Sequence, residues 1–394
     1  MPKSVVTTDD LMQPIAHFSF GVRAGDLIYI GATAGTDATR RLSGSTAGLT
    51  DTTAQSAQMF VNLDLSLRLL GGKIDDVVRV RSYITDWRDL HAYEAAYARY
   101  VSSRRPSHSI VGTHGFPLPQ ATVETELLAI LGGLHSHSQS ESLAKAVSLQ
   151  PLEGVAAKGQ HYCVASPLDA QGQGIERDPV AQTALTFQNL AKILEGSGLG
   201  LRDVVMLNVT LSDIRNFQVF ETTFRSLFRA PYPARSVQAA SLERNDMLVQ
   251  VESFAIAGGG RPLFGLGQPA ALGAASPGML AGDTLYIGAQ LGVRVDGTFP
   301  MDIEAQVRAA WERIYAVLAE AGMQNDDVIH TSNSLTDWRS YAGFNAGFGS
   351  FVSSPYPPRA TVLAGIVDPR ALVQVEALAH KKGRDATFIE VKPR

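Results

Sequence analysis

The sequence predicts an α+β protein of three tandem units, each with the element order β-β-α-β-α-β-β. Three features lead to this prediction: a glycine-led strand motif that occurs three times, a β-rich run ending at a turn aspartate that occurs three times, and an apolar helical stripe between the two. Self-similarity at a fixed period indicates that one supersecondary unit is repeated along a chain. The units are predicted near residues 12–133, 143–260 and 262–383.

Each unit is expected to begin with two strands. The second of them is the glycine-led motif, which reads GDLIYIGA from Gly25, GQHYCVAS from Gly159 and GDTLYIGA from Gly282. In the first unit the preceding run HFSFGVR alternates apolar and polar residues. Such period-2 alternation is typical of a strand with one buried face. We therefore expect a β-hairpin at the start of each unit.

A helix is expected after the hairpin, and the third unit shows it most clearly. Val307, Trp311, Ile314 and Leu318 are spaced by four, three and four residues. This spacing places them in one apolar stripe along a helix. Gly322 follows where a helix C-cap is expected. The stripe predicts that this helix packs on the sheet.

The second half of each unit is organised around a turn aspartate. Asp86, Asp213 and Asp337 recur at intervals of 127 and 124 residues. In the first unit a β-rich run at 77–85 precedes Thr-Asp, a helix N-cap signature, and a second helix is expected from about 87 to 100. Two further strands complete the unit.

The predicted units need one another. Two helices on one face of a sheet leave the other face exposed, and a sheet must bury its apolar face. Three such faces packed around a pseudo-threefold axis would cover each other, as in a closed cyclic trimer. The connecting segments 132–142 and 258–278 are rich in Gly, Ser, Pro and Ala, and we expect them to be flexible linkers.

Composition excludes several classes of function. The chain has 45% hydrophobic and 18% charged residues, which is typical of a globular protein. Its net charge of −4 does not favour nucleic-acid binding. No apolar run approaches the ~20 residues of a membrane span, and the N-terminus has no apolar signal region, so we expect a cytoplasmic protein.

Cysteine and histidine usage argues against a metal site. The single cysteine, Cys163, cannot form an intrachain disulfide or a zinc cluster and is expected in the core. His135 and His137 lie in a Ser-rich segment without an acid at ligand spacing. No metal is therefore expected.

The motifs resemble those of the Rid (YjgF) family. The resemblance rests on the runs AGDLIYIGA, DDVVRVRSYITD and YPARSVQAASLERNDMLVQVESFAIA, and it recurs once per unit. It implies a chorismate-mutase-like fold and a trimer with clefts between neighbouring subunits. This chain would then be a whole pseudo-trimer, acting as a monomer or a low-order homo-oligomer. The resemblance also implies that members with the full set of site residues hydrolyse enamines and imines such as 2-aminoacrylate without metal or organic cofactor, whereas members that lack part of the set have other roles.

The resemblance assigns an arginine to the carboxylate of the substrate. Arg235 in the second unit and Arg359 in the third unit match the family's Pro-x-Arg motif, whereas the first unit has His108 there. A guanidinium can bind a carboxylate through two parallel N–H bonds, and an imidazole cannot. The first unit is therefore expected to have lost or changed its ligand.

The family's water-activating glutamate is distributed differently. The position is Glu124 in the first unit but Gln250 and Gln374 in the others, and a glutamine cannot act as a general base. Arginine and acid therefore occur in different units. A second set of acids, two residues later, could supply the missing carboxylate or could be structural: Glu126, Glu252 and Glu376.

The remaining family positions are partly kept. The asparagine of the second helix is Asn345 in the third unit, but Glu94 and Glu221 in the others. Either glutamate could act as a replacement acid across a unit boundary or be a solvated helix residue.

The family also uses backbone N–H groups after the second strand and an early aromatic residue over the substrate. The backbone positions correspond to Gly31-Ala32, Ala165-Ser166 and Gly288-Ala289. The aromatic residue corresponds to Phe18, with Leu152 and Ala275 at the loosely aligned positions of the other units.

The sequence therefore favours a metal-independent hydrolase or deaminase acting on a small unsaturated or imine-bearing carboxylate at clefts between units. Glu124, Glu94 and Glu221 are the candidate catalytic acids. Two alternatives stay open: a chorismatase-like enzyme for a larger carboxylate, and a non-catalytic scaffold that binds small ligands. Which acid faces which arginine depends on the order in which the units meet.

Overall fold

The computed structural model describes residues 3–46, 50–101, 105–133, 136–139, 153–169, 172–174 and 176–392. His135, Leu152 and the side chain of His137 lie outside the described part. Within it, no helix is both long and apolar enough to cross a membrane.

The predicted order of elements occurs in all three units. The first unit comprises β2 (Gly21–Ala24), β3 (Leu27–Ala34), α1 (Thr52–Leu69), β4 (Val77–Ile84), α2 (Leu90–Tyr100), β5 (Ser107–Gly112) and β6 (Val123–Ile130). The second comprises β8 (Glu153–Ala157), β9 (Gln160–Ala165), α3 (Pro179–Glu195), β10 (Val204–Leu211), α4 (Phe217–Leu227), β11 (Ala234–Ala239) and β12 (Val249–Ile256). The third comprises β14 (Gly278–Ala281), β15 (Thr284–Leu291), α5 (Ile303–Glu320), β16 (Val328–Leu335), α6 (Tyr341–Gly349), β17 (Arg359–Leu363) and β19 (Val373–His380).

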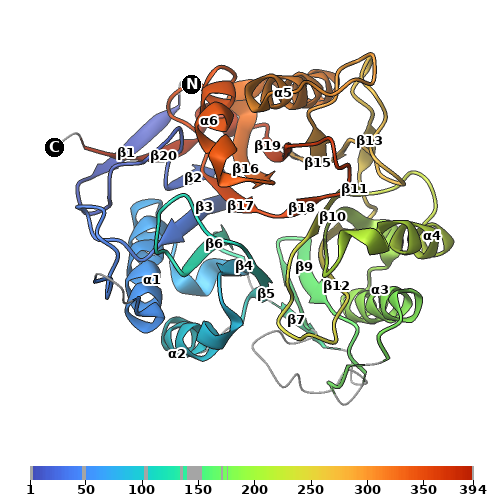
Figure 1. The fold of residues 1–394 in the computed structure, drawn as a ribbon, viewed down its shortest axis with the longest axis horizontal. Helices are drawn as coiled ribbons and strands as arrows, with labels where there is room; N and C mark the ends of the chain where they lie inside the picture. The colour runs from blue at the N-terminus through green and yellow to red at the C-terminus, as the bar shows by residue number, and fades with distance from the viewer. Residues whose placement is uncertain are drawn as a thin grey trace.

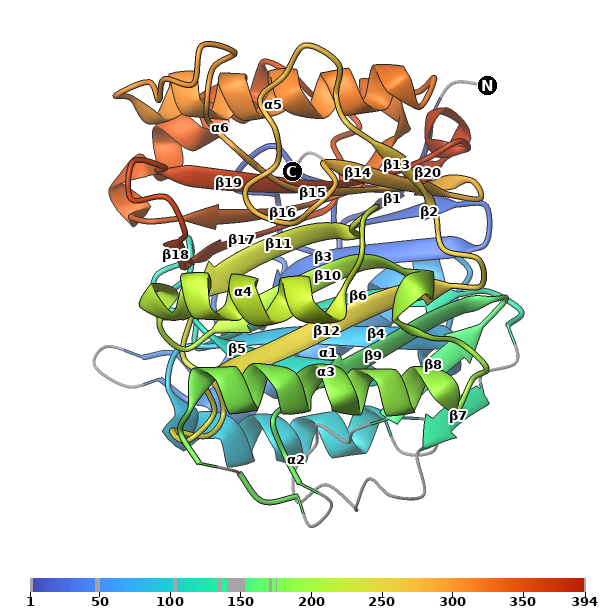
Figure 2. The same ribbon diagram turned by 90° about the vertical axis from the view of Figure 1, so that its right-hand side faces the viewer.

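Each unit is a mixed sheet with its two helices on one face. In the first unit the central strand order is β3-β6-β4-β5, and only β4 and β5 run parallel. The view in Figure 1 shows the helix pairs on the outside and the sheets around the centre. In the turned view, α3 and α4 lie side by side over the sheet of the second unit (Figure 2).

The helical stripe predicted in the third unit is confirmed. Val307, Trp311, Ile314 and Leu318 on α5 are all buried in the core of that unit. Burial contributes roughly 1.5–3 kcal/mol for each of the aliphatic side chains. Gly322 has a φ of +72° just after the last turn, a conformation that favours glycine.

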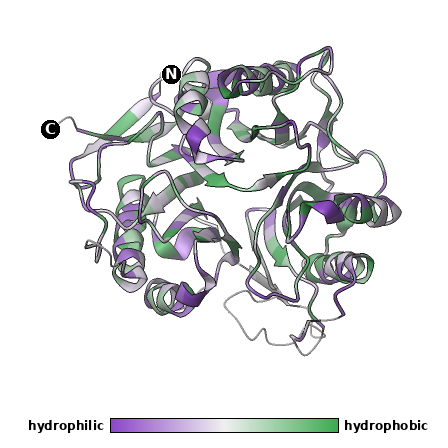
Figure 3. Ribbon diagram, viewed as in Figure 1, coloured by the Kyte–Doolittle hydropathy of each residue, from purple (hydrophilic) through white to green (hydrophobic). Residues whose placement is uncertain are grey.

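A further core lies where the three sheets meet. It contains apolar residues from every unit, among them Tyr29, Tyr162 and Tyr286, which occupy the same position in the three glycine-led strands. Figure 3 shows hydrophobic segments on the central strands of all three units, with hydrophilic stretches among them. This shared core confirms the predicted pseudo-trimer.

The hydrophilic stretches include the second set of acids. Arg79 lies 2.8 Å from Glu252 and 3.2 Å from Glu126, so it bridges two units. Arg81 pairs with Glu252 at 3.0 Å. All four side chains are buried. These acids are therefore tied into ion pairs between units.

The third unit completes this axial ion-pair network. His330 lies 3.1 Å from Glu126, and Ser236 Oγ donates to Glu376 at 2.7 Å. Although burial acts to raise it, the pKa of Glu126 is lowered to about 2 by His330 and Arg79. Removing one partner of a buried ion pair costs about 3–5 kcal/mol. The second set of acids thus has structural partners.

The connecting segments differ from the prediction of flexible linkers. Parts of them form strands that join the sheet of the following unit: β7 (Ser136–Gln139) pairs with β8, and β13 (Arg261–Leu263) pairs with β14. The hairpin of each unit presents an unpaired strand edge, and the entering chain satisfies its backbone groups.

The C-terminus closes the ring in the same way. β20 (Thr387–Val391) leaves the third unit and pairs with β2 of the first unit, and β1 (Ser4–Thr8) then pairs with β20. A short strand, β18 (Gly365–Ile366), also pairs with β11 of the second unit. Every unit therefore contacts the next through backbone hydrogen bonds as well as side chains.

The first strand of the first unit is shorter than predicted. Only Gly21–Ala24 pairs as β2, and residues 17–20 do not continue the strand. Instead His17 Nδ1 lies 3.2 Å from the carbonyl oxygen of Asn345 in the third unit. Contacts across the unit boundary replace strand pairing here, so this segment helps to build a cleft.

Candidate functional site

A cleft forms where the arginine strand of one unit crosses the second hairpin strand of the next. β17 packs on β3, β11 packs on β15, and β5 packs on β9. The crossing is close, because a Cβ at Gly31 would lie 2.8 Å from the backbone nitrogen of Arg359, and one at Gly288 would lie 2.6 Å from that of Arg235. Glycine at these two positions permits the approach.

This packing settles the order of the units. The third unit offers its arginine to the first, the second offers its arginine to the third, and the first offers His108 to the second. We call these the 3/1 cleft, the 2/3 cleft and the 1/2 cleft. The hairpin strand has a bulge at the crossing in two of them, between Ile30 and Thr33 and between Ile287 and Gln290.

The 3/1 cleft brings together the arginine and the acid that occur in different units of the sequence. Its pocket of about 510 Å³ has Glu124, Ala32 and Phe18 of the first unit on one side. Arg359 and Tyr341 of the third unit lie on the other.

Arg359 is held by aromatic rings and by one neutral acceptor. Its guanidinium carbon lies 5.1 Å from the ring of Phe344 and 4.7 Å from that of Phe348, both on α6. Its Nη2 donates to Asn345 Oδ1 and, at 3.4 Å, to Tyr341 Oη. The buried Nη1 has no hydrogen-bond partner within the described residues. Burial lowers the pKa of Arg359 from its usual value, because it removes water from the charged guanidinium. A bound anion would stabilise that charge, so the site favours an anionic ligand.

Glu124 is the second chemical group of the pocket. It is 8% exposed, and within the described ranges no hydrogen bond or ion pair engages its carboxyl group. Burial raises the pKa of Glu124 to about 8. An uncharged carboxyl beside a bound carboxylate can donate a proton near neutral pH, and its conjugate base can then accept one.

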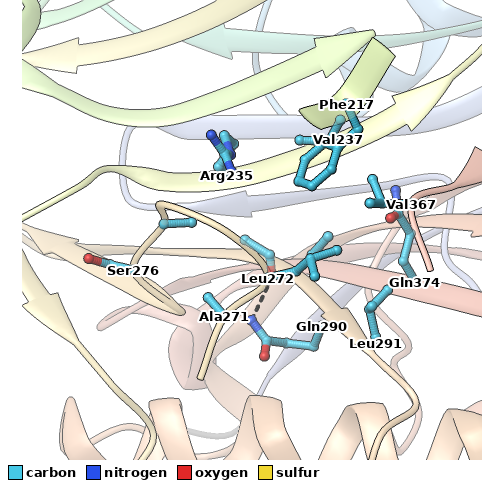
Figure 4. A pocket seen from close by; sticks show the side chains of 13 residues that line it. Phe217, Arg235, Val237, Ala271, Leu272, Ser276, Gln290, Leu291, Val367 and Gln374 are labelled. Atoms are coloured by element: carbon cyan, nitrogen blue, oxygen red, sulfur yellow. Dashed lines mark hydrogen bonds between the residues drawn. The ribbon is translucent and has the colours of Figure 1, made fainter. Parts of the chain in front are cut away.

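In the 2/3 cleft the arginine is already paired. Arg235 Nη2 donates to the Glu221 carboxylate at 2.6 Å, and Gln374 of the third unit lines the pocket of about 390 Å³. Figure 4 shows Arg235 and Phe217 on one side of this pocket and Gln290 and Gln374 on the other, with Leu272 between them. The pocket also includes Gly288 and Ala289, at the predicted backbone position.

In the 1/2 cleft a histidine stands in place of the arginine. His108 is 2% exposed, its ring stacks on Tyr97 with centroids 4.5 Å apart, and its Nε2 lies 3.0 Å from Tyr93 Oη. Burial lowers its pKa to about 3, so the ring is neutral. Across this boundary Trp87 Nε1 donates to Ser241 Oγ at 2.9 Å.

The other predicted acids lie elsewhere. Glu94 is 3.4 Å from His91 Nδ1 on its own helix, and Glu221 is bound to Arg235 and Arg225. Neither lines the pocket that contains Arg359. The buried Gln250 belongs to the second unit and does not line either arginine pocket. Of the three candidate catalytic acids, Glu124 alone lines a pocket with an arginine that has no ion pair among the described residues.

Tyr341 was missed by sequence reasoning. It lies four residues before Asn345 and therefore on the same face of α6. That spacing could have identified it.

Cys163 is buried in the core of the second unit, and its pKa is raised to about 12 by burial. Within the described residues, no group of three His, Cys, Asp or Glu side chains could hold a metal ion.

Comparison with known proteins supports the assignment of the repeats. The family model described as endoribonuclease L-PSP matches three times, at residues 8–131, 155–257 and 266–381. RidA from the Antarctic bacterium Psychrobacter sp. PAMC 21119 is 31% identical over 30% of this chain and 98% of its own, with a TM-score of 0.29. TdcF from E. coli with bound serine is 24% identical over 30% of this chain and 98% of its own, with a TM-score of 0.29.

One solved structure resembles more than a single unit. A chorismatase structure covers 77% of this chain and 93% of its own, at 13% identity and a TM-score of 0.56. At this identity the likeness shows a shared fold alone. The family model, in contrast, matches most of the sequence. Three matches in order, on units that carry the same elements and meet around one axis, show that the chain belongs to the endoribonuclease L-PSP (Rid/YjgF) family as three fused units.

Proposed function

We propose that the 3/1 cleft is the active site of a hydrolase that deaminates small enamine or imine carboxylates. The observation that carries this proposal is that Arg359 of the third unit and Glu124 of the first unit line one pocket. Family membership supports a deaminase or small-ligand-binding role, and this cleft has the groups that such a reaction needs.

The substrate carboxylate would bind to Arg359. Nη1, which has no hydrogen-bond partner among the residues that the structure describes, offers a donor, and Asn345 occupies Nη2 without neutralising the guanidinium. Charge-assisted hydrogen bonds of this kind are about twice as strong as neutral ones. The ring of Phe18, 5.9 Å from the guanidinium carbon, supplies an apolar wall for the substrate.

Glu124 would carry out both proton transfers. For 2-aminoacrylate, the protonated carboxyl donates its proton to the methylene carbon, and the C=C electron pair forms the new C–H bond while nitrogen becomes an iminium. The resulting Glu124 carboxylate then takes a proton from water as the water oxygen bonds to the iminium carbon. Loss of ammonia from this adduct leaves the 2-keto acid. The chemistry requires neither metal nor organic cofactor.

A larger carboxylate is the second candidate substrate. The observation behind it is that the fold is shared with a chorismatase structure over most of the chain. In this case Arg359 would keep its role as carboxylate binder, and Glu124 would protonate an enol ether instead of an enamine.

The test is release of ammonia and 2-keto acid from 2-aminoacrylate generated in situ, measured above the spontaneous rate. Arg359→Ala should lower turnover at least 100-fold. Arg235→Ala is the matched control, because it removes the equivalent side chain from the 2/3 cleft and should leave turnover within about twofold of wild type. Unchanged activity of Arg359→Ala would show that the active site lies elsewhere. No turnover by the wild type would favour the larger substrate, to be tested with chorismate, or a purely binding role.

A further inference from the structure

We propose that the 2/3 cleft is a second ligand site, and that it selects an uncharged, amide-like small molecule and rejects carboxylates. The proposal rests on the contacts of Arg235 and does not depend on turnover in the 3/1 cleft.

The charge of Arg235 is already satisfied from within the protein. Its Nη2 donates to Glu221 at 2.6 Å, and both side chains are buried. The same carboxylate also accepts from the backbone nitrogen of Ala274 and from Arg225 at 2.9 Å. A carboxylate held by three donors is not readily displaced, because moving it would leave a buried charge unpaired.

The segment joining the second and third units covers this ion pair. Gly273 has a φ of +73°, and a Cβ there would lie 2.8 Å from Arg235 Nη2 and 2.8 Å from each Glu221 oxygen. Alanines 271 and 275 and Leu272 from the same segment line the pocket. The pair is therefore enclosed by the chain and not open to exchange with a ligand anion.

One nitrogen of the guanidinium is left for a ligand. Arg235 lines the pocket, and its buried Nη1 has no hydrogen-bond partner in the described part of the chain. Since the positive charge is balanced, this donor suits a neutral carbonyl oxygen more than a second carboxylate, which Glu221 would repel.

The opposite wall offers an acceptor instead of an acid. Gln374 donates through Nε2 to Ser334 Oγ at 3.4 Å, which leaves its Oε1 as an acceptor. Phe217 on the side of Arg235, and Leu291 and Val367 beside Gln374, supply apolar surface (Figure 4). A ligand with a carbonyl acceptor, an N–H donor and an apolar body matches these groups.

A second buried arginine lies behind this wall. Arg313 Nε donates to Gln290 Oε1 at 3.1 Å, and its Nη2 donates to the carbonyl oxygen of Ala270 at 3.4 Å. Arg313 does not line the pocket, and burial lowers its pKa to about 10, so it remains charged at neutral pH. The positive charge of Arg313 attracts anions and therefore opposes the rejection of carboxylates. The experiment must compare a neutral ligand and an anionic ligand directly.

Benzamide and benzoate are suitable probes, because they share one shape and differ in charge. Both would be titrated by calorimetry into the full chain carrying Arg359→Ala, which removes the carboxylate site of the 3/1 cleft. Benzamide should bind at least tenfold tighter than benzoate, and additional Arg235→Met should weaken benzamide at least tenfold. Additional Glu221→Gln should reverse the preference, because the guanidinium then lacks its internal carboxylate.

Equal binding of the two probes, no binding of benzamide at millimolar concentration, or a preference unchanged by Glu221→Gln would each overturn the proposal. If Glu221→Gln does not fold, as judged by its melting curve, Gln374→Leu provides the alternative test. This variant leaves the ion pair intact and should weaken benzamide at least fivefold, and unchanged benzamide affinity would overturn the proposal. Failure of the deaminase assay would not affect any of these outcomes.

Discussion

The 3/1 and 2/3 clefts are built from the same elements and differ mainly in what faces the arginine. In the 3/1 cleft Arg359 meets a neutral amide, Asn345, and an acid across the boundary, Glu124. In the 2/3 cleft Arg235 meets an acid on its own side, Glu221, and an amide, Gln374, across the boundary. The acid and the amide have exchanged sides. An acid beside the arginine cancels its charge, whereas an acid across the cleft leaves the charge available to a ligand.

The 1/2 cleft continues this divergence. His108 replaces the arginine, and it is buried, neutral and stacked on Tyr97. The axial ion-pair network is equally asymmetric, because Arg79 and Arg81 occur in the first unit, where the second unit has Met206 and Asn208. A homotrimer must repeat each residue three times, and fusion into one chain removes this constraint.

Replacing the acid of the 3/1 cleft should have the largest effect on activity and should remove the functional difference between the two clefts. Glu124→Gln removes the proton donor and acceptor while leaving Arg359 in place, so we expect kcat/KM to fall about 10²–10⁴-fold. The measurement is the initial rate of ammonia release from 2-aminoacrylate. Gln374→Glu is the control and should add no activity, since Arg235 stays paired with Glu221. Wild-type activity of Glu124→Gln would refute the assigned role.

The dependence of kcat/KM on pH should report the protonation of Glu124. The pKa of Glu124 is raised to about 8 by burial, and the protonated form starts the proposed reaction. Activity should therefore be retained below pH 8 and should decline about tenfold per pH unit above it. The profile is measured as kcat/KM after subtraction of the spontaneous rate at each pH. A decline that persists unchanged in the residual activity of Glu124→Gln would assign it to another group.

Exchanging the acid and the amide of the 2/3 cleft should give it the arrangement, and the activity, of the 3/1 cleft. In a chain carrying Arg359→Ala, the pair Glu221→Asn and Gln374→Glu should restore turnover at least tenfold above the parent variant. The exchange frees Arg235 and places an acid across the cleft. Each substitution alone should restore less than the pair, because the reaction needs both groups. Absence of rescue in a folded double exchange would mean that other pocket residues also decide activity.

The smallest effect is expected for Tyr341→Phe. The hydroxyl accepts a long hydrogen bond of 3.4 Å from Arg359, and such a bond contributes about 0.5–1 kcal/mol. We expect KM for the carboxylate substrate to rise two- to fivefold with kcat little changed. Phe217 occupies the equivalent position in the 2/3 cleft, so the fold accommodates the change. A large fall in kcat would instead make Tyr341 a proton donor.

Local patterns predicted the units, helices and shared core well. The stripe of Val307 and Trp311 and the cap at Asp86 depend on spacing within a few residues, and the structure confirms both. The connecting segments were harder to predict. Their Gly, Ser and Pro content is typical of linkers, but the open edge of the next hairpin pairs with them as β7 and β13. Composition does not report a partner strand that lies in another unit.

The sequence by itself determined the three repeats, their internal order and the chemical identity of each site residue, because periodicity and residue type are local properties. It left Glu124 and Arg359, which are more than 200 residues apart, as unconnected signals. Only the tertiary structure decided the rotational order of the units around the axis, in which the arginine strand of the third unit faces the first unit and brings these two residues into one cleft. This rotational order depends on how the twisted sheets pack around the axis and on the pairing of β20 with β2. Both are long-range contacts, and no short window of sequence contains them.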